Sequence, residues 1–223
     1  EKWDKNIAIL SGDTMLIQSY QLISTLSPNI LSEIIDVFNK AAINVCEGQQ
    51  WDMDFETKNN VSISEYLQMI EYKTAVLFSA ALKIGAITSG ANSVDQNNLY
   101  EFGRNLGIAF QLKDDLLDAF GSFESFGKQV GGDILANKKT YLYLKALEIS
   151  NKKQHNKLIN YYSSHENSID KVKNIISIFR ELEIPELTVN LMKKFHEKAM
   201  KHLDQINSDN KPPLIDFSKM LLD

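Results

Sequence analysis

The sequence predicts an all-α protein. Apolar residues recur with a helical period along almost the whole chain, and no segment shows the strict alternation of a half-buried strand or the Asn-Gly type turn of a hairpin. With 223 residues, of which 43% are hydrophobic and 24% charged, the chain is long enough for a sizeable core. No internal repeat, low-complexity tract or linker divides the sequence, so we expect one domain over residues 1–223.

The first two helices are expected on either side of Ser27-Pro28. The periodic segment Asn6–Leu26 predicts the first helix. Ser27, followed by a proline in the first helical turn, favours the start of a second helix that reaches the region of Trp51.

Two further helix starts match the capping box, in which a serine and the acid or amide three residues later satisfy free backbone amides reciprocally. They are "SISE" (Ser62–Glu65) and "SVDQ" (Ser93–Gln96), and each is expected to open a long amphipathic helix. The least polar stretch, Thr74–Ala91, carries Lys83 at its centre. We therefore expect a buried core helix there, and not a membrane span.

The helix that opens at Ser93 is expected to end near Gly121. The following segment, Gly121–Asn137, is glycine-rich and aperiodic, which predicts a loop long enough to be functional. Shorter helices are expected beyond it, at Lys139–Ile149, Lys152–Ser163, Ile169–Leu182 and Glu186–Ile206, with a last one after Pro212-Pro213.

Charge and cysteine content exclude several classes of function. The net charge of -5 argues against nucleic acid as the main partner, because phosphate binding requires a basic face. Cys46 is the single cysteine, which excludes an internal disulfide and a multi-cysteine metal site and fits a reducing, cytoplasmic compartment. The first residues, "EKWDKNIAIL", lack both the pattern of a signal peptide and an initiator methionine, so we expect the natural N-terminus to precede Glu1.

Three acids lie together in the otherwise apolar segment "FQLKDDLLDAFG" (Phe110–Gly121). In a helix, Asp114, Asp115 and Asp118 fall within an arc of about 100° and therefore share one face. Like charges this close raise one another's pKa and destabilise the helix unless something positive lies among them. Oxygen ligands suit Mg²⁺, which keeps several waters and bridges one or two carboxylates to substrate phosphates.

An acidic patch in solvent is the ordinary explanation of such a pattern. The neighbouring residues favour a cavity instead, because Leu112, Leu116, Ala119 and Phe120 indicate that the core surrounds most of this helix. The acids would then open into a restricted space.

The segment after these acids supplies two lysines among glycines. Lys128 and Lys138 lie near glycines at 127, 131 and 132, which let backbone amides approach an anion closely. Acids, metal, phosphate and lysines would neutralise one another there. A loop in solvent is the alternative explanation for the lysines.

These segments resemble the trans-type prenyl diphosphate synthases, also called polyprenyl synthetases. "GIAFQLKDDLLD" is similar to that family's second aspartate-rich motif, and "GKQVGGD" and "NKKT" resemble the lysine-bearing loop after it. Upstream, "ILSGD", "EGQQWD" and "YLQMIEYKTAVLF" resemble further family segments in the right order. The ordered matches span Ile9 to Thr140.

The resemblance implies an isoprenoid synthase fold, a bundle of long helices around a deep apolar pocket with two aspartate-rich helices facing each other at its mouth. About three Mg²⁺ ions would hold the diphosphate of an allylic substrate there. Loss of that diphosphate leaves an allylic carbocation, which the double bond of isopentenyl diphosphate attacks before a proton is lost. Metal and lysine charges would stabilise the departing pyrophosphate. The resemblance also implies a homodimer formed through long helices.

Candidate site residues follow from their places in the matched motifs. The resemblance assigns metal binding to Asp114 and Asp115, less directly to Asp118, and through water to Asp52. It assigns substrate binding to Lys73, Lys128, Lys138, Gln49 and Phe110, and catalysis to Lys73, Thr74 and Gln111. The ordinary alternatives are buried polar residues satisfied by helix carbonyls for Thr74 and Gln49, and core packing for Phe110.

The chain departs from the family pattern at its beginning. The first aspartate-rich motif, its adjoining arginines and the basic residues that bind isopentenyl diphosphate would lie upstream of Glu1, and no second D-D-x-x-D occurs in the sequence. We therefore expect the chain to be part of a longer protein. Asn137 stands where many members have glycine, and asparagine tolerates the same left-handed backbone.

Two other functions are compatible with the same residues. A terpene cyclase of similar fold would ionise the same kind of substrate and release pyrophosphate and a hydrocarbon without consuming isopentenyl diphosphate. A regulatory or structural subunit would keep the helices without catalysis, which is expected if the gene starts at Glu1. Farnesyl, geranylgeranyl and longer products are all compatible with the sequence.

Overall fold

A computed structural model describes residues 4–58, 60–121, 131–163 and 168–222. Within these ranges all regular structure is helical, which confirms the all-α fold class. The helices in chain order are α1 (Lys5–Ser24), α2 (Pro28–Thr57), α3 (Ile63–Ile70), η1 (Glu71–Ala75), α4 (Val76–Thr88), α5 (Ser93–Phe120), α7 (Gly132–Leu135), α8 (Tyr141–Ile149), α9 (Lys152–Ser163), α10 (Ile169–Glu181), α11 (Ile184–Asp204) and α12 (Pro212–Leu222).

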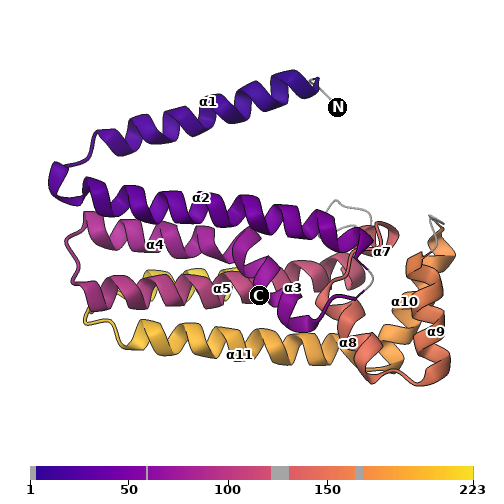
Figure 1. Cartoon of the computed structure of the whole chain (residues 1–223). Coiled ribbons are helices and arrows are strands. Elements are labelled where there is room, and N and C mark those ends of the chain that lie inside the picture. Colours follow the sequence, from indigo (N-terminus) through magenta and orange to yellow (C-terminus); the bar gives the residue numbers. More distant parts are fainter. Residues whose placement is uncertain (1–3, 59, 122–130, 164–167, 223) are drawn as a thin grey trace.

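Helix α5 is the central element of the bundle (Figure 1). It packs most extensively against α11 and α4, and α2 in turn covers α4 and η1. The helices α7, α8, α9 and α10 gather at one end of the bundle, and α1 projects away from α2. No residue of α1 is buried.

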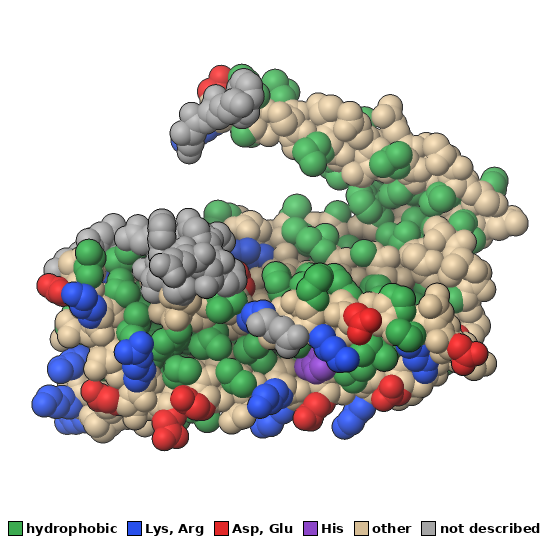
Figure 2. Space-filling view, turned by 180° about the vertical axis from the view of Figure 1, so that it is seen from behind, with side chains coloured by type: hydrophobic (Ala, Val, Ile, Leu, Met, Phe, Trp, Pro, Cys, Tyr) green, Lys and Arg blue, Asp and Glu red, His purple; other side chains and the backbone are tan. Residues whose placement is uncertain are grey.

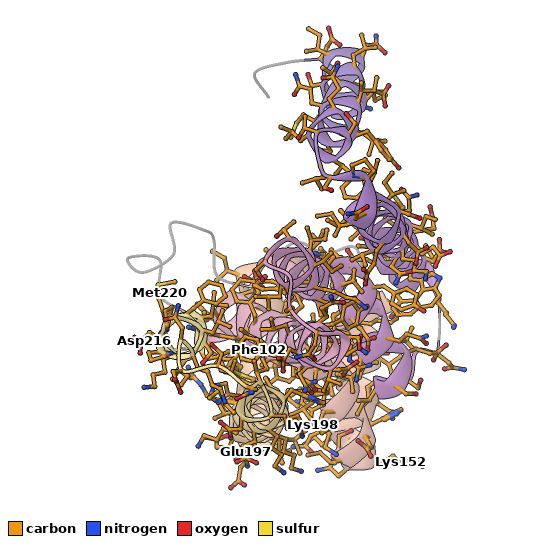
Figure 3. All side chains as sticks on the ribbon, turned by 90° about the vertical axis from the view of Figure 1, so that its left-hand side faces the viewer. Phe102, Lys152, Glu197, Lys198, Asp216 and Met220 are labelled. Carbon is orange, nitrogen blue, oxygen red and sulfur yellow. The ribbon has the colours of Figure 1, made fainter. Side chains whose placement is uncertain are left out.

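Two clusters of apolar side chains form the core. The larger one includes Leu112 of α5 and Ile175 of α10, both fully buried. The smaller one joins α5 to α11 through residues such as Phe102 and Leu203. In the view along the bundle, Phe102 points into the interior, whereas Glu197 points outward (Figure 3). Burying one large apolar side chain contributes about 1.5–3 kcal/mol to the stability of the fold. Because α5 supplies buried side chains to both clusters, it is packed on both sides.

One of the two expected capping boxes is confirmed. The Ser62 hydroxyl accepts a hydrogen bond of 3.2 Å from the Glu65 amide, and the Glu65 carboxylate accepts one of 2.8 Å from the Ser62 amide. The box expected at Ser93 is wrong, because Asn92 caps α5 instead and its side-chain oxygen accepts from the amides of Val94 and Asp95, each at 3.0 Å. Asparagine is as good an N-cap as serine, and it stands one residue earlier.

Several expected boundaries are corrected. Helix α2 continues past Trp51 to Thr57, and Ser27 occupies its N-cap position without a side-chain capping hydrogen bond. Helix α11 begins at Ile184 with a proline in its first turn, where a missing amide costs nothing. Part of the expected loop, Gly132–Leu135, is helical. The rest of that segment, residues 122–130, lies outside the described ranges.

The apolar stretch Thr74–Ala91 does not form a fully buried helix. One side of α4 is buried through residues such as Val76 and Ile87, but Leu77 is 53% exposed. Helix α4 lies between α2 and α5, which together cover only part of its surface. Among the described residues, no helix has both the length and the apolar character that a membrane crossing requires.

A π-helical segment, η1, joins α3 to α4 and was not predicted. Its wider turn carries Lys73 and Thr74, and such single turns occur often at functional sites. Two glycines let neighbouring helices touch its backbone. A Cβ on Gly48 of α2 would lie 2.3 Å from the backbone nitrogen of Lys73, and a Cβ on Gly107 of α5 would lie 2.5 Å from the Cα of Ala75. The backbone of η1 is therefore fixed between α2 and α5.

Replacing Gly48 with alanine is expected to destabilise the protein and displace Lys73. The added methyl would meet backbone atoms that cannot move aside independently, and overpacking of this kind costs about 1–3 kcal/mol. The free energy of unfolding in urea measures the effect. Gly85→Ala is the matched control, because nothing lies within 4 Å of its added methyl. Helix propensity predicts that this substitution raises the free energy of unfolding by up to about 1 kcal/mol. Equal effects of the two substitutions would contradict the close approach at Gly48.

Candidate active site

A cavity of ≈ 180 Å³ lies where η1 and α5 meet the end of α2 and the segment after α7. Its wall contains acids, lysines and apolar side chains together. The lining residues are Asp52, Phe55, Tyr66, Met69, Ile70, Lys73, Gln111, Asp114, Asp115, Asp133, Lys138, Lys139 and Thr140. Four of these are aspartates and three are lysines, so acids are in excess in a partly dehydrated space.

The wider turn of η1 directs Lys73 toward α2. The Lys73 ammonium donates to a carboxylate oxygen of Asp52 at 2.6 Å, and both side chains are largely shielded from solvent. This pair joins two segments of the chain at the wall of the cavity. A charge-assisted bond of this length orients the ammonium firmly.

Hydrogen bonds connect the next residue of η1 to the acids of α5. The Thr74 hydroxyl donates to the side-chain oxygen of Gln111 at 2.9 Å. The amide nitrogen of Gln111 then donates to Asp115 at 3.0 Å and, more weakly, to Asp114 at 3.4 Å. Asp115 also accepts a hydrogen bond from the Tyr66 hydroxyl of α3. Gln111 is thus fixed with its oxygen toward Thr74 and its nitrogen toward the acids.

The third acid of α5 holds α7. The carboxylate of Asp118 accepts a 2.9 Å hydrogen bond from the amide of Asp133, and the carbonyl of Asp118 accepts one of 2.6 Å from the amide of Gly131. Asp133 in turn pairs with the Lys138 ammonium at 3.1 Å. Asp118 therefore lies outside the cavity wall but determines where Asp133 and Lys138 lie.

Lys139 has a different role from its neighbour. Its ammonium donates to two carbonyl oxygens at the end of α2, that of Phe55 at 2.5 Å and that of Glu56 at 3.1 Å. Carbonyls in the last turn of a helix lack helical partners, and a cation there is favourable. Lys139 thus caps α2 and brings its C-terminal end to the cavity.

Burial dominates the electrostatics of the acids. It raises the pKa of Asp115 to about 7, although the hydrogen bonds from Tyr66 and Gln111 oppose this shift. Burial also raises the pKa of Asp118, against the hydrogen bond from the Asp133 amide. Burial alone would lower the pKa of Lys138, but the charge of Asp133 and the hydrogen bond to it raise the pKa, so this ammonium stays protonated.

The carboxylates fit Mg²⁺ as oxygen donors that share a site with substrate. Among the described residues, no three carboxylate, imidazole or thiol groups lie close enough together to hold a metal ion by themselves. Mg²⁺ commonly takes one or two carboxylates and completes its shell with water and substrate phosphate. Asp114 faces the cavity and its one described hydrogen bond is the long one from Gln111, which leaves acceptor capacity for a cation.

Most of the expected site residues come together. The cavity wall contains Asp52, Lys73, Gln111, Asp114, Asp115 and Lys138. Thr74 joins them through Gln111. Gln49 does not line the cavity and is exposed. Its side chain is rotated by about 100° around the axis of α2 from that of the buried Gly48, and therefore points away from the interior. Phe110 packs against Phe78 with ring centroids 5.8 Å apart and does not line this cavity, so its part in substrate binding stays a prediction. Lys128 lies outside the described residues.

Sequence reasoning missed four polar residues of the cavity: Tyr66, Asp133, Lys139 and Thr140. All of them lie inside the matched motifs, yet they bear no sign of their roles. Tyr66 lies seven residues before Lys73, a spacing that places both on one side of a helix, and this is the signal that could have identified it.

A family model described as "Polyprenyl synthetase" matches residues 1–179. The geranylgeranyl diphosphate synthase of Sulfolobus acidocaldarius is 34% identical over 216 residues, which are 95% of this chain and 65% of that enzyme. The chain thus spans less than two thirds of the length of this relative.

Solved structures agree in fold. A crystal structure of a geranylgeranyl pyrophosphate synthase has a TM-score of 0.93 at 42% identity, covering 99% of this chain and 69% of that one. A polyprenyl synthase from Caulobacter crescentus, complexed with calcium and isoprenyl diphosphate, has a TM-score of 0.84 at 25% identity, covering 97% of this chain and 63% of that one. The expected isoprenoid synthase type of fold is confirmed.

Asp115→Asn is expected to flatten the pH dependence of stability in buffers without divalent cations. Because the pKa of Asp115 rises from 3.8 to about 7 on folding, the folded state binds the extra proton and stability falls as pH rises between these values. The variant and the wild type should be about equally stable near pH 4. Near pH 8 the variant should be more stable by about 2–4 kcal/mol, as measured by urea unfolding.

Asp216→Asn, an exposed change on α12, is the control and should leave the pH profile unaltered. Parallel profiles for wild type and Asp115→Asn would show that Asp115 is not buried as a neutral acid.

Proposed function

Because this chain belongs to the polyprenyl synthetase family, we propose that it acts as a Mg²⁺-dependent prenyltransferase. It condenses isopentenyl diphosphate with an allylic diphosphate and yields a trans-prenyl diphosphate that is five carbons longer. The names of its relatives, which include geranylgeranyl diphosphate synthase, support this class of reaction. The acids and lysines of the cavity support a metal-bound diphosphate as the group that it receives.

The observation that carries the proposal is the pairing of lysines with aspartates around one cavity. Lys73 and Lys138 lie at its wall, each beside an acid, and Asp114 faces the same space. A diphosphate brings several negative charges, which lysines bind directly and carboxylates bind only through cations. This combination suits a metal-bound diphosphate better than it suits either a free cation or a free anion.

Each polar residue has a proposed part in the reaction. Asp114 and Asp115 would hold Mg²⁺, Asp118 would support them from behind, and Asp52 would contribute through water. About three Mg²⁺ ions, when bound, would supply charge stabilisation for the departing pyrophosphate. Lys73 and Lys138 bind the diphosphate oxygens, where negative charge grows as the carbon–oxygen bond breaks.

The bond between Thr74 and Gln111 prepares the cavity for a cation. Their oxygen atoms meet at 2.9 Å, and Gln111 cannot rotate without losing its contact with Asp115. Oxygen dipoles fixed in this way stabilise an allylic cation without reorganising. The apolar side chains of Met69 and Ile70 exclude water that would capture the cation.

We also propose that the protein forms a homodimer. Exposed apolar side chains gather on α1, and these are Ile7, Ile9, Leu10, Met15, Leu16, Ile17, Tyr20 and Leu22. Figure 2 shows hydrophobic side chains both along α1 and on the surface that it faces. A monomer rarely leaves a patch of this size in water, and a second copy of the same long helix is a self-complementary cover.

Asp114→Ala in the intact gene product is expected to lower the rate of Mg²⁺-dependent incorporation of labelled isopentenyl diphosphate at least about a hundredfold. The substitution removes a proposed metal ligand beside the leaving group. Glu101→Gln, on the same helix but in a surface ion pair with Arg104, is the control and should retain activity. Retained turnover in Asp114→Ala would reject the assignment. Release of pyrophosphate and a hydrocarbon without consumption of isopentenyl diphosphate would indicate the cyclase instead.

Sedimentation velocity of the intact gene product is expected to give the mass of a dimer. Replacing Ile9 and Leu16 together with lysine should shift the protein to monomer, since two charges would be buried in the proposed interface. Ser11→Lys, on the same helix, is the control for added charge alone. A monomeric wild type would contradict the proposal.

A further inference from the structure

We propose that Lys171, in the first turn of α10, is a positioning residue that aims Lys138 at the cavity by holding the backbone turn at Asn137. The functional part of this inference rests on the proposed function, in which Lys138 binds diphosphate. Its structural part stands on contacts outside the cavity wall, made by an element that none of the matched motifs includes.

The observation that begins the argument is a buried lysine. Lys171 is 1% exposed, and its backbone amide donates to the N-cap hydroxyl of Ser168 at 3.1 Å. Its ammonium donates to the side-chain oxygen of Asn137 at 2.6 Å and lies 5.9 Å from the centre of the Tyr162 ring. A buried ammonium needs partners, and the side-chain oxygen of Asn137 is one of them.

Asn137 adopts a conformation that needs such support. Its φ is +56°, in the left-handed region that side chains other than glycine rarely enter and that asparagine tolerates best. Its own amide donates to the carbonyl of Ile134 at 3.2 Å, and the next amide, of Lys138, donates to the carbonyl of Asp133 at 2.9 Å. The turn at Asn137 thus ends α7 and sets the direction in which Lys138 leaves it.

Two anchors therefore hold the segment that carries Lys138. At the start of α7, Asp118 accepts a hydrogen bond from the Asp133 amide at 2.9 Å. At its end, Lys171 holds Asn137. Lys138 follows the second anchor directly, and its ammonium reaches back to Asp133 at 3.1 Å. The first anchor comes from α5 and the second from α10, so α10 acts on the cavity without touching it.

The first experiment measures amide hydrogen exchange by NMR in the intact, ligand-free gene product. Lys171→Met keeps the volume of the side chain but removes its charge and donors. The Lys138 amide should exchange about tenfold faster or more in this variant, since a hydrogen bond from a charged group contributes at least that factor to an equilibrium constant. The Phe102 amide, within α5, should be unchanged. Lys173→Met, at an exposed position two residues along α10, is the control.

The second experiment asks whether the effect runs through the turn at Asn137. Binding of magnesium pyrophosphate, measured by calorimetry, should weaken about tenfold in Lys171→Met, and Lys171→Arg should restore most of it. Glycine adopts the left-handed turn without a side-chain contact. In an Asn137→Gly background, the same Lys171→Met change should therefore weaken binding less than about threefold.

The outcomes separate the alternatives. Unchanged exchange at Lys138 in Lys171→Met would overturn the inference, and so would equal losses of binding with and without Asn137→Gly, which a purely structural lysine would give. If Lys171→Met does not fold, Asn137→Ala must weaken pyrophosphate binding and Asn137→Gly must not. A wild type that does not bind magnesium pyrophosphate would contradict the proposed function, while exchange at Lys138 would still decide the positioning.

Discussion

Asp115 sits inside the bundle between Tyr66 and Gln111, and the arrangement of the site depends on these hydrogen bonds. A carboxyl group with 6% exposure needs donors, and here they come from two different helices. Because Gln111 is used in this way, its oxygen is left for Thr74 of η1. One buried acid thus connects α3, η1 and α5 through side chains alone.

The three lysines near the cavity differ in what they contact, although their sequence context is similar. Lys73 pairs with Asp52, Lys138 pairs with Asp133, and Lys139 donates to the carbonyls at the end of α2. In the proposed function, two of them exchange an acid for a phosphate oxygen of the substrate, since both partners are anionic oxygens. The third maintains the cavity by fixing a helix end.

Local pattern was sufficient for most helices and for the acid-bearing face of α5. The capping box at Ser62 and the proline of α2 are signals that act within a few residues, and they were read correctly. Features that depend on contacts between distant segments were missed. The bond from Tyr66 to Asp115 joins residues 49 apart in sequence, and the backbone of η1 lies against Gly48 and Gly107 of two other helices. Neither carries a compositional signal.

The three acids show the same division. Their helical spacing placed Asp114, Asp115 and Asp118 on one side of α5, but spacing cannot say which partner each one meets. Asp118 accepts its hydrogen bond from the amide of Asp133 in α7 and does not line the cavity. Burial in the core raises the pKa of Asp115. Asp114 alone keeps the open environment that the pattern suggests for all three.

The π-helical turn also bears on the phase of everything after it. A π turn accommodates one residue more than an α turn, so deleting a single residue between Glu71 and Ala75 would let α3 and α4 merge into one regular helix. Because the π turn takes up the extra residue within a single turn, this deletion would leave α4 in nearly the same phase relative to α3. A deletion within α4 itself, next to Val76, would instead rotate the residues after it by about 100°, which would turn the exposed Leu77 inward and the buried Ser79 outward. The helix can therefore change in length by one residue at η1 without turning the face that α4 presents to its neighbours.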